Sequence, residues 1–204
     1  MQLLPLHGSS ITPHLDALAQ LRLTVFREWP YLYDGTLADE LDYLHTYASS
    51  PRSIVLLALD GTKVIGATTG LPLAEAHEEF QAPFRVSPWS PADIFYLGES
   101  VLLAPYRGQG LGHAFFDHRE QHAAALGTFR LTSFCAVQRA PLDPRRPTDY
   151  RPLDPFWQKR GYQRQDHLRA HFHWKEVNAP GETRNTLTFW TKPLPAVSNQ
   201  PCSA

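Results

Sequence analysis

Two stretches near the start of the chain carry apolar residues at helical spacing. In the first, Thr12 can cap a helix that opens at Pro13, and the apolar stripe that follows ends near Trp29 and Pro30. The second stretch, 37–47, repeats apolar residues three and four positions apart and has acidic side chains in its first turn, where the helix dipole favours them. The pattern predicts two amphipathic helices before any strand.

Shorter, continuously apolar runs further along predict strands. Residues 53–59 and 63–71 flank Asp60-Gly61, a dipeptide typical of a hairpin turn. The remaining expected elements are strands at 94–103, 129–137, 167–175 and 184–190, helices at 111–126 and 155–160, and a short helix within the connection 74–92. This mixture predicts an α/β (α+β) fold with helices on the faces of a sheet.

Length and composition are those of one compact domain. The chain has 204 residues, of which 43% are hydrophobic and 19% charged, and that length allows a good-sized core. No internal repeat is visible. We therefore expect a single domain over 1–192, followed by a flexible tail over 193–204.

Charge, hydropathy and cysteine content exclude several classes of protein. A net charge of -1 gives no basic field for a nucleic acid. No apolar run approaches the ~18 residues that span a bilayer, and the first ten residues lack the pattern of a secretory signal. Only two cysteines occur, Cys135 and Cys202, so no disulfide framework is expected. We expect a cytoplasmic protein that binds neither nucleic acid nor membrane.

The most informative segment joins the strand 94–103 to the helix 111–126. Pro105 ends the strand, and Arg107-Gly108-Gln109-Gly110-Leu111-Gly112 then opens the helix. Glycines let backbone N–H groups approach a ligand closely, and the start of a helix adds unpaired donors and positive potential. The segment is therefore suited to a pyrophosphate.

Two common phosphate motifs do not match this segment. A P-loop needs Gly-Lys-Ser/Thr, whereas Gly112 is followed by His113. A dinucleotide fingerprint needs glycine or alanine where this chain has Phe115. A glycine-rich turn without a ligand stays the plain alternative.

The pattern Arg/Gln-x-x-Gly-x-Gly/Ala after a strand and a proline resembles the acyl-CoA loop of the GNAT superfamily of N-acetyltransferases. A second segment, Pro155-Phe-Trp-Gln-Lys-Arg-Gly-Tyr162, resembles the family's Phe-Tyr-x-x-x-Gly-Phe motif. The order of the predicted elements also follows the family, so the resemblance covers roughly residues 12 to 190. It implies a mixed, mostly antiparallel twisted sheet with a splayed central strand pair and helices on both faces.

Acetyl-CoA is the cofactor that the resemblance implies, as acyl donor and without a metal. The splayed strands would be 97–103 and 129–137, with the pantetheine in the gap between them. Backbone groups near Val101 and Leu102 would pair with it and polarise the thioester carbonyl, while the N–H groups of 108–112 hold the pyrophosphate. The implied cofactor-binding residues are Val101, Leu102, Leu103, Arg107, Gly108, Gln109, Gly110, Leu111, Gly112, His113 and Trp157.

Acyl transfer to an amine also requires a proton acceptor. Deprotonating an alkyl ammonium with a pKa near ~10.4 costs about 4.6 kcal/mol at pH 7, so we expect a general base. Glu99 is the candidate, because alternation puts Leu97, Val101 and Leu103 on the same face of an apolar strand and burial raises the pKa of a carboxylate. A purely structural carboxylate is the alternative, and Glu28 is the reserve base.

The sequence departs from the family where many members have a tyrosine that protonates the departing thiolate. That position is Trp157, which is not an acid and would pack against the pantetheine arm or the core. Tyr150, Tyr162 and Cys135 are the substitutes, of which we select Tyr150 as a catalytic candidate. A thiolate whose thiol has a pKa of about 8.5 is already a tolerable leaving group, so the reaction can proceed without a general acid.

The family builds its acceptor pocket from the first two helices, their connection and the final hairpin. Here the connection 26–35 holds four aromatic rings and two acids, so Glu28, Trp29, Tyr31 and Tyr33 are the expected acceptor-binding residues. A hydrophobic lid over the core is the alternative. The arginine-rich insertion 140–154 would fold over the same opening.

These residues lead to one function and one rival. The function is transfer of an acetyl group from acetyl-CoA to a primary amine of a small molecule, amino acid or peptide, by direct attack in a ternary complex. The rival is a GNAT-fold module that binds CoA or a partner protein without catalysis, which Trp157 favours. The acceptor, the acyl length and the oligomeric state stay open, a homodimer being one arrangement.

Two pairs of histidines have the spacing of metal ligands, His118/His122 on a helix and His171/His173 on a strand. Each pair lacks a third ligand, so we expect no metal site.

Overall fold

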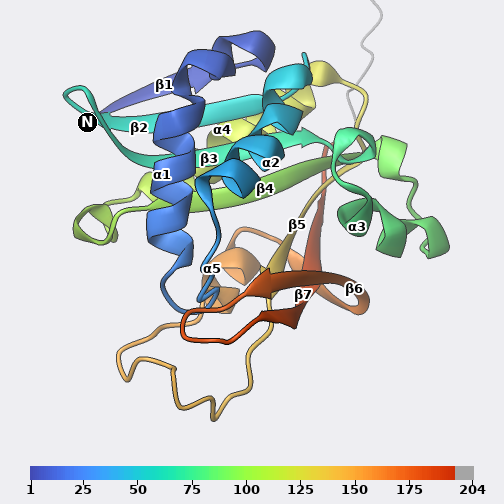
Figure 1. Cartoon of the computed structure of the whole chain (residues 1–204). Helices are drawn as coiled ribbons and strands as arrows, with labels where there is room; N and C mark the ends of the chain where they lie inside the picture. The colour runs from blue at the N-terminus through green and yellow to red at the C-terminus, as the bar shows by residue number, and fades with distance from the viewer. Residues whose placement is uncertain (196–204) are drawn as a thin grey trace, which may run out of the picture.

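The computed structural model describes residues 1–195, in which seven strands form one sheet of order β1-β2-β3-β4-β5-β7-β6 (Figure 1). The strands are β1 (Gln2–Leu6), β2 (Ile54–Asp60), β3 (Lys63–Pro72), β4 (Ile94–Leu102), β5 (Leu131–Val137), β6 (Gln163–Lys175) and β7 (Glu182–Pro193). Only β4 and β5 pair in parallel. The predicted mixed, mostly antiparallel sheet is confirmed.

Helices lie on both faces of this sheet, as predicted. They are α1 (Leu15–Phe26), α2 (Leu37–Ser49), α3 (Glu78–Gln81), α4 (Leu111–Leu126) and α5 (Asp154–Lys159), with 3-10 turns η1 (Gly8–His14), η2 (Leu73–Glu75), η3 (Ala82–Val86), η4 (Pro91–Asp93) and η5 (Ala104–Tyr106). The helices α1 and α2 cover one face and α4 the other (Figure 1). Each face has its own buried cluster, one around Leu18, Leu44 and Tyr96 and one around Phe116 and Phe134.

Two predictions near the N-terminus are wrong. The chain opens with the edge strand β1, which pairs antiparallel with β2 from Gln2–Leu59 to Leu6–Val55. Its shortness and Pro5 conceal it in the sequence, although an edge strand tolerates proline because one row of its N–H groups faces solvent. Thr12 and Pro13 lie inside η1, and the α-helix begins only at Leu15.

The strands β4 and β5 separate soon after they meet. Their pairing covers only Ile94–Tyr96 against Leu131–Ser133, and beyond Tyr96 they diverge toward the end where α5 lies (Figure 1). This confirms the expected splayed pair. We call the space between β4 and β5 beyond Tyr96 the gap.

A β-bulge in β4 begins where the gap begins. Thr68 pairs with Ser100 but Gly70 with Leu97, so Gly98 and Glu99 together stand opposite one residue of β3. A bulge bends a strand and increases its twist. Only glycine fits at 98, because a Cβ there would lie 2.1 Å from the hydroxyl of Tyr47.

The bulge corrects the expected alternation around Glu99. Leu97 packs in the cluster beneath α4, whereas Val101 packs in the cluster beneath α1 and α2. The carboxylate of Glu99 contacts residues of α1 and α2 and therefore shares its side with Val101, not with Leu97. One extra residue in the strand reverses the faces that simple alternation assigns.

The C-terminal hairpin closes the sheet on the other side of the gap. The strands β6 and β7 are longer than predicted and pair from Gln163–Thr191 to Lys175–Glu182. Tyr33, from the α1–α2 connection, bridges to Glu176 at the end of this hairpin. The sheet reaches Pro193, and residues 196–204 of the expected tail lie outside the described residues. Within residues 1–195 no helix is both long and apolar enough to cross a membrane.

Candidate active site

The loop between β4 and α4 presents a row of free backbone donors. The N–H of Arg107 donates to the Ala104 carbonyl at 3.2 Å, and that of His113 to the Gly110 carbonyl at 3.0 Å. Between them, no described group accepts from the N–H groups of 108–112. Gly108 and Gly110 have φ of +75° and +84°, a conformation that favours glycine. Unpaired amides at the start of a helix are the kind of group that binds anions, so this loop is a candidate site for a diphosphate.

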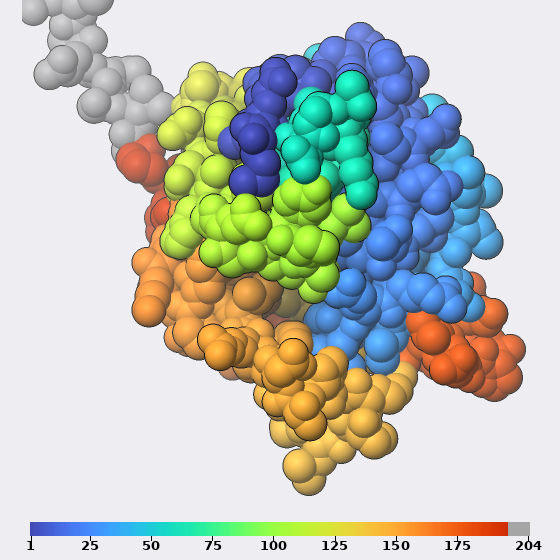
Figure 2. Space-filling model, turned by 90° about the vertical axis from the view of Figure 1, so that its left-hand side faces the viewer, coloured from blue at the N-terminus to red at the C-terminus, as the bar shows by residue number. Residues whose placement is uncertain are grey.

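The backbone of Leu102 faces the gap. Leu103 donates its N–H to the Ile65 carbonyl at 3.0 Å, so alternation turns Val101 to β3 as well and Leu102 away from it. In agreement, the Leu102 carbonyl accepts from Arg107 Nε at 2.9 Å. Val101 and Leu103 therefore pair with β3 and do not face the gap, which leaves Leu102 as the one residue of the expected three whose backbone is free for the pantetheine. Figure 2 shows the surface hollowed here, between the yellow-green loop after β4, the orange region of α5 and the blue end of α1.

Arg107 and Glu28 contact each other. Arg107 Nη1 lies 2.8 Å from Glu28 Oε2, and both side chains are about half exposed, at 44% and 46%. The arginine thus lies back over β4 instead of extending along the loop. Nearby, Gln109 Nε2 donates to the Pro105 carbonyl at 3.2 Å, and His113 Nδ1 is 3.3 Å from Arg160 Nη1.

Glu99 lies in a buried polar cluster between β4 and the first two helices. Its carboxylate forms an ion pair with Arg22 of α1 and accepts from the hydroxyl of Tyr43 of α2 at 3.2 Å. Arg22 also pairs with Glu40, and all three charged residues are less than 9% exposed. Burial alone would lower the pKa of Arg22, but the charges of Glu99 and Glu40 outweigh it and raise that pKa.

A cavity of about 290 Å³ opens beside Glu99. We call it the aromatic cavity; it is lined by Arg22, Phe26, Tyr31, Tyr33, Asp39, Glu40, Tyr43, His77, Glu79, Phe80, Tyr96, Gly98, Glu99, Cys135, Phe172, His173, Trp174 and Leu187. Its walls come from α1, α2, their connection, the splayed strands and the β6–β7 hairpin, as expected for an acceptor pocket. Burial raises the pKa values of Tyr31 and Tyr43, so both phenols stay protonated at neutral pH.

Half of the predicted acceptor residues border this cavity. Tyr31 and Tyr33 line it, whereas Glu28 and Trp29 do not. Glu28, the reserve base, pairs with Arg107 and does not line the cavity. Trp29 packs edge-on against Tyr150 at 6.0 Å.

The candidate proton donors are distributed over three places. Tyr150 is half-buried against Trp29, and burial raises its pKa. Tyr162 lies under α4, where its hydroxyl donates to Glu120 at 3.0 Å. Cys135 lines the aromatic cavity 3.2 Å from the Tyr96 hydroxyl, and burial raises the pKa of its thiol to about 12. Of the three, only Cys135 borders the aromatic cavity.

Trp157 packs against the core, one of the two places expected for it. Its ring centroid is 5.0 Å from that of Phe134 in β5 and 5.2 Å from that of Trp190 in β7. The indole therefore fills space behind β5 and anchors α5 to the sheet.

Three residues of the site were missed in the sequence. Arg22, Glu40 and Tyr43 lie on the predicted helices, but their mutual contacts depend on how α1 packs on α2. A signal was present for Arg22, since it follows Leu18 by four positions and so lies on the apolar stripe of its helix. A charged residue there is buried only with a partner.

Arg139 was also missed, and it orders one wall of the cavity. Its guanidinium donates to the carbonyls of Pro30 and Tyr31 at 2.6 and 2.7 Å and to the Glu176 carboxylate at 2.6 Å. Arg145, from the insertion 140–154, pairs with the same carboxylate. The insertion, the α1–α2 connection and the hairpin thus meet at Glu176.

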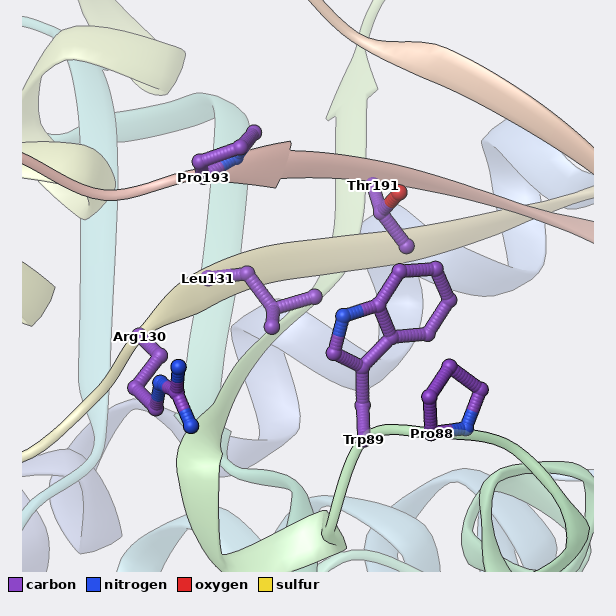
Figure 3. A pocket seen from close by; sticks show the side chains of 6 residues that line it. All are labelled: Pro88, Trp89, Arg130, Leu131, Thr191 and Pro193. Atoms are coloured by element: carbon purple, nitrogen blue, oxygen red, sulfur yellow. The ribbon is translucent and has the colours of Figure 1, made fainter.

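A second cavity of about 290 Å³ lies where β4 and β5 are still paired. Figure 3 shows Trp89 beside Leu131 and Thr191, with Pro88, Arg130 and Pro193 around them. No carboxylate lines this cavity, and Leu131 pairs with Ile94 at the closed end of the gap. It has no means of accepting a proton from an amine.

Comparisons with known proteins agree with this geometry. The family model described as "Acetyltransferase (GNAT) family" matches residues 17–143, more than half of the chain. No curated protein matches the sequence.

Solved structures share the fold over nearly their whole length. An acetyltransferase from Thermus thermophilus has 19% identity and a TM-score of 0.54, with 95% of this chain and 98% of that one covered. NAA60 of Arabidopsis thaliana in complex with a bisubstrate analogue has 11% identity and a TM-score of 0.60, covering 96% and 99%. An aminoglycoside 6'-N-acetyltransferase complexed with coenzyme A has 16% identity and a TM-score of 0.56, covering 96% and 98%. At these identities the similarity establishes the fold.

Proposed function

Because the chain belongs to the GNAT family of acetyltransferases, we propose that it transfers an acetyl group from acetyl-CoA to a primary amine by direct attack in a ternary complex. The observation that carries the proposal is the combination of the N–H groups at 108–112, five groups without a partner among residues 1–195, with the gap beside Leu102. Backbone N–H groups arranged in this way select an anion by its shape and charge, whatever side chains the loop residues carry. Two structural relatives whose ligands are named, one with coenzyme A and one with a bisubstrate analogue, support the choice of donor.

The residues present fit the donor in two places. The amides of 108–112 would bind its diphosphate, and the backbone of Leu102 would pair with the pantetheine arm. Acetyl-CoA would supply the acetyl group as an activated thioester at the open end of the gap. Because Arg107 is already engaged by Glu28 and Leu102, we assign the anion contacts to backbone groups first.

Glu99 is the proposed proton acceptor for the attacking amine. It lines the aromatic cavity and belongs to the bulge of β4 beside the gap, which supports its assignment as the group that takes the proton from the amine, directly or through one water. Arg22 and the Tyr43 hydroxyl hold the carboxylate in one orientation. Glu28 stays the reserve.

Protonation of the departing thiolate depends less on a catalytic residue than deprotonation of the amine does. Trp157 cannot donate, and Tyr150 is the proposed donor because its phenol stays protonated at neutral pH. A thiolate with a solution pKa of about 8.5 also leaves at a useful rate without an acid.

Calorimetric titration of the full chain with CoA, followed by measurement of free CoA released in the presence of an amine panel, tests the proposal. We expect saturable CoA binding and amine-dependent release. Absence of any affinity for CoA would overturn the proposal. Binding without turnover on any amine would instead favour a non-catalytic CoA-binding module, the reading to which Trp157 points.

A further inference from the structure

We infer that the amine acceptor carries a second positive charge, as in a small diamine, and that Glu79 and Asp39 at the mouth of the aromatic cavity select it. This inference deepens the proposed acetyl transfer and rests on it for the reacting amine. It is argued from the charge balance, the walls and the size of the cavity.

The buried part of the cavity carries more negative than positive charge. Glu40 and Glu99 are 2% and 8% exposed, and Arg22 is the single cation between them. Glu99 Oε1 is in ionic contact with Arg22, which Glu40 also engages, so the two carboxylates share one cation. Two carboxylates against one guanidinium leave one buried negative charge, which is costly without a partner. A cation in the cavity would compensate it.

The mouth of the cavity adds two exposed acids. Asp39, in the first turn of α2, and Glu79, in α3, line the cavity and are both exposed. Taken over the whole lining, four carboxylates face one guanidinium, with His77 and His173 as the other titratable nitrogens. A ligand whose reacting amine lies at Glu99 would bring a second cation toward Asp39 and Glu79.

Aromatic rings form the walls between these two acidic ends. Tyr31 lies 6.0 Å from Trp174 and 4.6 Å from Phe26, and Tyr43 stacks on His77 at 5.5 Å. Ring faces attract cations and accept methylene chains equally well. The walls therefore suit a flexible alkyl chain with ammonium groups at its ends.

The same lining disfavours acceptors with a free carboxylate. Arg22 is already paired with both Glu40 and Glu99, and within the described part of the chain no lysine lines the cavity. A carboxylate on the ligand would meet like charges at both ends. The volume of about 290 Å³ is at the small end for ligand sites and fits a small molecule.

The test compares three amines of equal chain length: α,ω-diaminopentane, n-pentylamine and ω-aminopentanoate. Release of CoA from acetyl-CoA gives kcat/KM for each, and calorimetry gives their affinities for the CoA-bound full chain. We expect the diamine to exceed pentylamine by roughly tenfold in both measurements, the effect of about one ion pair, and to exceed the aminopentanoate by more. Raised salt should reduce the preference, because the mouth is exposed.

Glu79→Gln isolates the mouth. We expect it to lower the diamine values several-fold and the pentylamine values by much less, so that the diamine preference falls. Glu78→Gln is the matched control. Glu78 is the next residue to Glu79 in the chain, but its carboxylate pairs with Arg85 and does not line the cavity.

Two outcomes would overturn the inference: pentylamine or aminopentanoate used or bound as well as the diamine, or equal effects of the Glu79 and Glu78 variants. Absence of turnover with all three amines would instead count against the proposed function. The calorimetric affinities of the three amines test the charge preference whether or not the protein turns them over.

Discussion

Arg22 and Glu99 form a buried ion pair that joins α1 to the bulge of β4. Neither side chain is more than 9% exposed, so the pair is shielded from solvent and from salt. Glu40 holds the arginine from the other side. The carboxylate proposed as the base is therefore fixed in position by its own counter-ion, a feature that an isolated desolvated acid would lack.

Replacing Glu99 tests that role. Glu99→Gln keeps the size of the side chain and leaves Arg22 paired with Glu40, so the fold should persist. We expect kcat with a good amine to fall about a hundredfold at neutral pH, the usual effect of losing a general base. CoA affinity should stay nearly unchanged, because the proposed contacts with the donor are at 102 and 108–112.

The dependence of the rate on pH distinguishes a catalytic role of Glu99 as a base from a purely structural role. The rise of log kcat with pH that a base imposes should disappear in Glu99→Gln. Glu182→Gln, an exposed carboxylate in β7, should behave as the unchanged protein. An identical profile in the Glu99 variant and the unchanged protein would remove Glu99 from the base role.

Gly110→Ala should weaken CoA binding. Gly110 caps α4 with φ +84°, where an L side chain costs about 1–2 kcal/mol. The loop would relax and misalign its donors, so we expect roughly a tenfold rise in the CoA dissociation constant, measured by calorimetry.

Gly181→Ala is the control for that substitution. A Cβ at 181 also meets nothing within 4 Å, but Gly181 is not in the left-handed region. Equal affinities for the two alanine variants would show that the loop amides do not hold the diphosphate.

Glu176→Gln should destabilise the protein in a pH-dependent way. Burial opposes ionisation of Glu176, but the hydrogen bonds from Arg139 and Arg145 outweigh it and lower its pKa. The carboxylate thus contributes stability that is complete above its unfolded pKa of about 4.3 and is lost as the pH falls through the lower folded value.

Thermal unfolding at several pH values measures this effect. At pH 7 the substitution should cost about 3 kcal/mol, as expected when one partner of a buried pair is removed. The difference in melting temperature should shrink as the pH falls below about 4. A difference independent of pH would argue that the charge of Glu176 contributes nothing.

Cys135 should resist alkylation in the folded protein. Burial raises the pKa of its thiol to about 12, against the opposing effect of the hydrogen bond with the Tyr96 hydroxyl 3.2 Å away. At pH 8 the thiolate fraction is on the order of one in ten thousand. Mass spectrometry of the peptide 131–137 after iodoacetamide should show little label without denaturant and full label in urea. Equal labelling in both conditions would contradict the buried, protonated state.

The sequence by itself determined the loop and most elements. The helix predicted at 111–126 matches α4, with Gly127 at its end, because capping glycines and apolar spacing act within a few residues of the chain. The glycines at 108 and 110 likewise mark the candidate anion site, because they favour the left-handed backbone that the loop adopts.

Only the tertiary structure decided which side chains meet. The hydroxyl of Tyr47, 51 positions away in the sequence, leaves room only for glycine at 98, and the bulge there reversed the face assigned to Leu97. The pairing of Arg22 with Glu99 and of Arg107 with Glu28 depends on how helices pack on the splayed sheet. Local patterns fix conformation because backbone preferences act over a turn of chain, whereas charged side chains from distant segments find their partners only after the layers have assembled.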